Sequence, residues 1–141
     1  MTIVVDASVV VDWVAPDTDP KSASVAALQI LLQHDGELIA PGLLHMETAN
    51  ALLNGIRRGR WSGNDADRAH TLLDSLPVRA VNEERDVARA WELSRRYDNH
   101  PVYDMAYVAL AERTRSQLVT ADTRLRSHLV GVDWVVGPED L

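Results

Sequence analysis

Short apolar runs and longer amphipathic segments alternate along the chain. The apolar runs are rich in β-branched residues and predict buried strands, whereas apolar residues that recur every three or four positions predict helices. The expected strands are residues 3–5, 37–40, 77–81, 117–122 and 132–136, and the expected helices are residues 22–34, 41–57, 64–75, 83–96 and 101–114. No linker, repeat or low-complexity run interrupts the alternation, so residues 1–141 are expected to form a single domain.

Two acidic residues follow expected strands. Strands that alternate with helices predict a mainly parallel sheet with helices on both faces. In such a sheet, ligands bind beyond the carboxyl ends of the strands. Asp6 directly follows the first expected strand, and Asp122 lies at the end of the fourth. The two carboxylates are therefore expected at the same edge of the sheet.

Composition narrows the class of protein only slightly. Without cysteine, the chain has no disulfide and no thiolate metal site, which fits a reducing, cytoplasmic setting. The N-terminus lacks the basic region and cleavage site of a signal peptide, and no apolar stretch is long enough to span a membrane. The net charge of −7 argues weakly against nucleic-acid binding, but clustered metal-binding acids would also produce such an excess.

Four acidic residues carry the candidate chemistry. Individually, Asp6 and Asp122 suit a turn or a helix N-cap, and Asp104 suits the first turn of a helix. Glu47 is harder to explain, because it interrupts the apolar segment "LLHMETANALL", where a buried charge needs a cation or solvent.

Gathered at one sheet edge, these carboxylates would repel one another and require a cation. A ligand set made only of oxygen atoms selects Mg²⁺ or Mn²⁺. Such an ion activates water, and the reaction that follows most naturally is hydrolysis of a phosphodiester. Ser8 and Thr120, each two residues from an acid, either hydrogen-bond these oxygens or are ordinary turn residues.

Four segments resemble the ordered sequence blocks of PIN-domain proteins. They are "IVVDASVVVDW", "PGLLHMETANAL", "VYDMAYVALAE" and "LVTADTRL", and the resemblance is nearest to the VapC-type toxins of bacterial toxin–antitoxin pairs. It implies a three-layer α/β/α sandwich with a central, mainly parallel sheet of about five strands. The family's catalytic acids fall on Asp6, Glu47, Asp104 and Asp122. Of these, Asp6, Asp104 and Asp122 are expected to be the metal ligands. The family's hydroxylated residue in the last block falls on Thr120.

The same resemblance implies an activity and partners. A VapC-type protein is a Mg²⁺- or Mn²⁺-dependent endoribonuclease, a hydrolase that cuts RNA phosphodiester bonds. It forms a homodimer and is held inactive by a cognate VapB-type antitoxin. The basic segment "RRGRW" is the candidate RNA contact. The alternative is that it is simply the solvated end of a helix, where arginine complements the helix dipole. The residues concerned are Arg57, Arg58, Arg60 and Trp61.

Two other functions fit less of the sequence. A phosphotransfer domain with a nucleophilic Asp6 would want a lysine late in the chain, but Lys21 is the only lysine. A PIN-like module that binds RNA or protein without cutting would be expected to lack an acid, and none of the four is missing. Asp98, close to the "VYD" block, is a minor alternative for the site.

Overall fold

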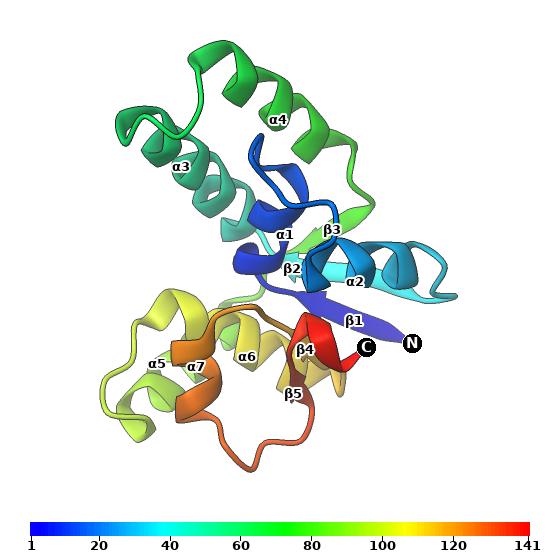
Figure 1. Cartoon of the computed structure of the whole chain (residues 1–141). Helices are drawn as coiled ribbons and strands as arrows, with labels where there is room; N and C mark the ends of the chain where they lie inside the picture. The colour runs from blue at the N-terminus through cyan, green and yellow to red at the C-terminus, as the bar shows by residue number, and fades with distance from the viewer.

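Five parallel strands form one central sheet in the order β3–β2–β1–β4–β5 (Figure 1). The computed structural model describes residues 1–141. The strands are β1 (Thr2–Val5), β2 (Glu37–Pro41), β3 (Val78–Val81), β4 (Gln117–Val119) and β5 (Val135–Val136). All five strands expected from the sequence are present, and every pairing between them is parallel.

Helices cover both sides of this sheet. They are α1 (Ala7–Val14), α2 (Ala23–Leu32), α3 (Leu43–Arg57), α4 (Gly63–Ser75), α5 (Glu84–Arg96), α6 (Val102–Thr114) and α7 (Thr123–His128), followed by the 3₁₀ turn η1 (Pro138–Asp140). Figure 1 shows α1 to α4 on one side and α5 to α7 on the other. The predicted α/β/α sandwich is therefore confirmed. None of the helices has the length and apolar character needed to cross a membrane.

The order of the strands creates a switch point beside β1. The chain moves outward from β1 to β2 and β3, then returns through α5 and α6 to place β4 on the other side of β1. Val5 of β1 lies in register with Val119 of β4, and the backbone N–H of Asp6 donates to the Val119 carbonyl at 2.9 Å. In parallel sheets, the crevice at such a reversal is the usual ligand site.

Helix α1 was not expected from the sequence. Its segment "ASVVVDWV" is rich in valine, which disfavours helix relative to strand. Two features offset this propensity. Asp6 caps the helix by accepting from the Ser8 N–H, and Val9, Val10 and Val14 are buried. Tertiary packing has thus decided the conformation of a segment that propensity alone misassigns.

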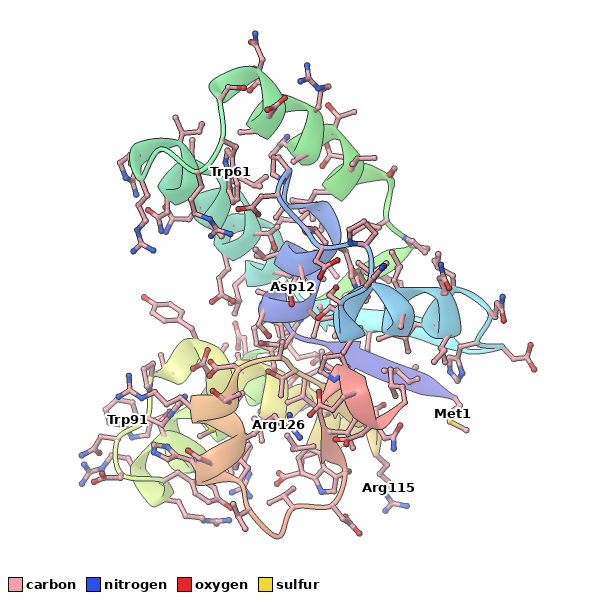
Figure 2. The ribbon with its side chains drawn as sticks, viewed as in Figure 1. Met1, Asp12, Trp61, Trp91, Arg115 and Arg126 are labelled. Atoms are coloured by element: carbon pink, nitrogen blue, oxygen red, sulfur yellow. The ribbon has the colours of Figure 1, made fainter.

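Several large apolar side chains on the helices are exposed. On α3, Met46 is 76% exposed and Leu53 is 52% exposed. On α5, Val87 and Trp91 are each 65% exposed, and the helix buries Leu93 in the core instead. Figure 2 shows Trp91 on the outside of α5. The rule that core residues are apolar does not work in reverse, since much of any protein surface is also apolar.

Candidate active site

Asp6 is the single residue between β1 and α1, and it lies at the switch point of the sheet. Its side chain is buried, with 4% of the residue exposed. One oxygen, Oδ2, accepts from the Ser8 Oγ at 2.5 Å and the Ser8 N–H at 3.3 Å, and from the Thr120 Oγ1 at 3.0 Å. The carboxylate thus caps the helix while it is held from two neighbouring strand ends.

The hydroxyl groups of Ser8 and Thr120 each use their only proton on Asp6. Both oxygens then accept a backbone N–H, from Ala121 to Ser8 Oγ at 3.0 Å and from Asp122 to Thr120 Oγ1 at 3.1 Å. With both protons committed, the 3.3 Å contact between the two hydroxyl oxygens adds little. These hydrogen bonds fix the orientation of the Asp6 carboxylate, and none of them comes from a basic side chain.

Burial raises the pKa of the Asp6 carboxyl above its usual value. The hydrogen bonds from Ser8 and Thr120 oppose this effect, and the nearby charge of Asp104 adds to it. A carboxylate in this position is costly to ionise, because three hydrogen bonds on one oxygen do not replace a counter-ion.

Glu47 lies one turn into α3, and its partner is a tyrosine. The Tyr107 hydroxyl donates to Glu47 Oε1 at 2.7 Å, and the tyrosine is fully buried. Burial raises the pKa of Glu47, the hydrogen bond from Tyr107 lowers it, and the charges of Asp6 and Asp104 raise it again. Burial and the Glu47 charge in turn raise the pKa of Tyr107, so the phenol remains a donor.

Asp104 lies in the first turn of α6, as the sequence predicted. Its Oδ2 contacts the Nε2 of His100 at 2.6 Å. The raised pKa values of Asp6 and Glu47 both include repulsion from Asp104. Asp6, Glu47 and Asp104, which are far apart in the sequence, are therefore close enough in the structure for their charges to interact.

Asp122 has its side chain engaged in capping a helix. It is the N-cap of α7, and its Oδ1 accepts from the N–H groups of Arg124 at 3.0 Å and Leu125 at 3.1 Å. Its charge does not contribute to the raised pKa values of Asp6 and Glu47. Asp122 is connected to the other acids only through its backbone, which donates to the hydroxyl that holds Asp6.

The donor chemistry of the coupled acids fits a hard divalent cation. No three His, Asp or Glu side chains are already arranged as a complete metal site. Mg²⁺ does not require one, because it is usually held by one or two carboxylates, several waters and a substrate phosphate. A cation would also relieve the repulsion that raises the pKa values of Asp6 and Glu47.

The three arginines of the "RRGRW" segment lie at the far end of α3 from Glu47. With a rise of about 1.5 Å per residue, Arg57 lies roughly 15 Å along the helix from Glu47. Arg57 and Arg58 are exposed. Arg60 already has a partner, since it contacts both carboxylate oxygens of Asp17 at 2.9 to 3.1 Å.

Trp61 does not lie where base stacking would require it. The residue is 8% exposed, its Nε1 donates to the Leu52 carbonyl at 2.9 Å, and its ring lies against the backbone of Gly55. The Arg60 guanidinium lies 4.7 Å from the ring centroid. The hypothesis that Trp61 stacks on RNA is therefore wrong for this structure, because the ring packs in the core.

Sequence reasoning missed three side chains that contact the acids or their partners: Tyr107, His100 and His128. None of the three is among the site residues expected from the sequence. Tyr107 lies three residues after Asp104 on α6, a spacing that places both on one helix face and offered a usable signal. No comparable signal joins His128 to His100, because they are distant in sequence.

Comparison with known proteins identifies related sequences. The PIN domain family model matches residues 3–128. Ribonuclease VapC1 of Mycobacterium tuberculosis (strain ATCC 25618 / H37Rv) is 35% identical over 126 residues, which cover 86% of this chain and 86% of that protein.

Two solved structures share the fold. A toxin–antitoxin complex from Klebsiella pneumoniae contains a chain that superposes with a TM-score of 0.65 and 18% identity, covering 96% of this chain and 97% of that one. Mycobacterium tuberculosis VapC20, described as a Sarcin-Ricin loop cleaving toxin, superposes with a TM-score of 0.64 and 17% identity, covering 88% of this chain and 94% of that one. At these identities, the likeness supports the fold alone.

Proposed function

This chain belongs to the PIN-domain family, and we propose that it is a metal-dependent endoribonuclease of the VapC type. The observation that carries the proposal is the coupling of Asp6, Glu47 and Asp104 at the switch point of the sheet. Asp6 follows β1, whereas Glu47 lies on α3 and Asp104 on α6, and the charge of Asp104 adds to the effect of burial in raising the pKa of both Asp6 and Glu47. A fold that concentrates negative charge in this way is suited to a cation-dependent reaction on a phosphate.

We propose Mg²⁺ or Mn²⁺ as the ion, with Asp6, Asp104 and Asp122 as its ligands. Asp122 uses only Oδ1 to cap α7, which leaves Oδ2 for a ligand. When bound, the ion would neutralise phosphate charge and lower the pKa of water. Ser8 and Thr120 hold the Asp6 carboxylate in one orientation, and Tyr107 holds that of Glu47.

Glu47 is the acid best placed to handle a proton. Burial and the charges of Asp6 and Asp104 raise its pKa against the opposing effect of the Tyr107 hydrogen bond, and a carboxylate with a raised pKa is the stronger base. The single donor on its Oε1 leaves Oε2 as an acceptor. We therefore assign Glu47 as the general base, which would accept the proton as the water attacks phosphorus.

The proposed RNA contacts are Arg57 and Arg58, which are exposed at the end of α3. Two protein partners are also proposed, a cognate VapB-type antitoxin and a second copy of this chain. The first is supported by the curated VapC relatives. Exposed apolar side chains on α3 and α5, including Met46 and Trp91, are compatible with either protein contact.

The experiment that tests the function is cleavage of total cellular RNA by the purified chain. Reactions contain EDTA, Mg²⁺ or Mn²⁺, and the matched variants are Asp104→Asn and, as a control with the same loss of charge, Asp74→Asn. Asp74 is exposed on α4. We expect discrete fragments that need the metal, persist in Asp74→Asn and vanish in Asp104→Asn.

Cleavage at the wild-type rate by Asp104→Asn would contradict the assigned site. Metal-independent RNA binding without cleavage, by a folded protein free of antitoxin, would instead identify a binding module. Circular dichroism of each variant establishes that lost cleavage is not lost folding.

A further inference from the structure

A chain of three side chains connects α7 to Asp104. The Nδ1 of His128, the last residue of α7, lies 2.9 Å from the Nδ1 of His100. The Nε2 of His100 lies 2.6 Å from Asp104 Oδ2. The two imidazole rings meet edge to face, with centroids 4.8 Å apart and an interplanar angle of 78°.

The direction of the hydrogen bonds follows from their end point. An ionised Asp104 can only accept, so the Nε2 of His100 must donate to it. With its single proton at Nε2, the His100 ring can accept at Nδ1 from the Nδ1–H of His128. Each donor polarises the next, which strengthens the bond that reaches Asp104.

His100 does more than fill the core. The residue is 4% exposed, yet both ring nitrogens bind side chains and neither binds backbone. It does not cap α6, whose N-cap, Pro101, has no side-chain hydrogen bond. The turn before it contains two consecutive left-handed residues, Asp98 at φ 57° and Asn99 at φ 56°. The backbone thus adopts an uncommon conformation immediately before His100.

We propose that His100 and His128 are positioning residues, which fix the Asp104 carboxylate for its metal. The inference rests on the proposed function, because it takes Asp104 as a ligand. The bond to His100 occupies one lone pair of Oδ2 and restrains the carboxylate, leaving Oδ1 for the cation. Because His128 and Asp122 lie at opposite ends of α7, the same contact holds the helix that begins with the third proposed ligand.

The test measures Mn²⁺ binding by electron paramagnetic resonance of the free ion, without RNA. The variants are His100→Leu, His100→Gln and His128→Phe, and the control is His70→Leu at an exposed position of α4. Loss of a side chain that orients a metal ligand typically weakens metal binding by about 10- to 100-fold. We expect that loss in His100→Leu and a smaller one in His128→Phe. His100→Gln should recover most of the affinity, since its amide N–H can replace Nε2–H.

Equal Mn²⁺ affinity in His100→Leu and the wild type would overturn the inference and leave the proposed function intact. Failure of the wild type itself to bind Mn²⁺ would instead overturn the metal site. Nitrogen-15 spectra of the wild-type histidines give a second test that needs no variant to fold. His100 is expected to carry a proton at Nε2, and an Nε2 without a proton would contradict the proposed direction of the chain.

Discussion

Replacing Asp6 with asparagine should stabilise the metal-free protein at neutral pH while it destroys the metal site. The substitution removes a buried charge that has no counter-ion. Asparagine keeps one carbonyl oxygen, which can still accept from Ser8 and Thr120. The perturbation is therefore confined largely to charge.

The magnitude follows from two opposing effects. The effective cost of burying an ion is several kcal/mol. A hydrogen bond to a charged group contributes about 1.5–3 kcal/mol against about 1 kcal/mol for a neutral pair, so two hydroxyl donors lose roughly 1–4 kcal/mol in all. We expect a net gain of about 1–2 kcal/mol, or roughly 2–8 °C in Tm for a chain of this size.

The pH dependence has a definite sign. A carboxyl whose pKa is raised on folding stabilises the folded state below its usual pKa, and this stability is lost as the pH rises through the raised value. Burial raises the pKa of Asp6, so the wild type is penalised at neutral pH. The advantage of Asp6→Asn should therefore disappear at about pH 4 and below, where the wild-type carboxyl is also protonated.

Thermal unfolding in EDTA and in Mn²⁺ provides the assay, with Asp74→Asn as the exposed control. At a free Mn²⁺ concentration of about 100 Kd, the wild type should gain about 2.7 kcal/mol, and Asp6→Asn should gain almost none. A variant less stable than the wild type in EDTA at pH 7.5 would refute the argument from buried charge. A variant that Mn²⁺ stabilises as much as the wild type would refute the assignment of Asp6 as a ligand.

Three further variants test the roles of Tyr107, Trp61 and the arginine pair at the end of α3. Tyr107→Phe removes the donor to the Glu47 carboxylate, and should lower the free energy of unfolding by about 1.5–3 kcal/mol in urea titrations and slow RNA cleavage. An unchanged rate would show that Glu47 needs no such support. Trp61→Phe removes the hydrogen bond to the Leu52 carbonyl and should lower the free energy of unfolding by about 1 kcal/mol, while the cleavage rate of the folded protein stays unchanged. A raised KM at full stability would instead indicate that Trp61 binds RNA. Replacing Arg57 and Arg58 with alanine should raise KM at constant kcat and reduce the salt slope of RNA binding by about 1.4, and an unaltered slope would place the RNA elsewhere.

The arrangement of the sheet could be predicted because it depends on periodicity and connection order. Buried β-branched runs separated by helices restrict the chain to a parallel sheet, and the position of Asp6 after the first run then places it at the carboxyl edge. Helix α1 escaped prediction because valines with strand propensity occupy it. Its formation depends on a local cap from Asp6 and on the burial of Val9 and Val10, and the burial is a tertiary effect that propensity does not include.

The partners of the acids could not be predicted in the same way. His128 reaches His100 only because α7 packs beside the turn that precedes α6, and no local pattern encodes that meeting. The basic residues next to Trp61 in the sequence suggested that its ring stacks on RNA. In the structure the ring is buried instead, in the space left by the missing side chain of Gly55. The direction of a side chain beyond its own element depends on packing against distant segments, which periodicity does not specify.

The central claim is that the acids at the switch point of the sheet hold a divalent metal ion. A crystal structure of the chain grown with Mn²⁺, with anomalous diffraction measured for manganese, tests this most directly. We expect an anomalous peak in contact with carboxylate oxygens of Asp6 and Asp104, and its loss in Asp104→Asn. A Mn²⁺ ion bound away from these carboxylates, in a protein that still cleaves RNA with this metal, would contradict it.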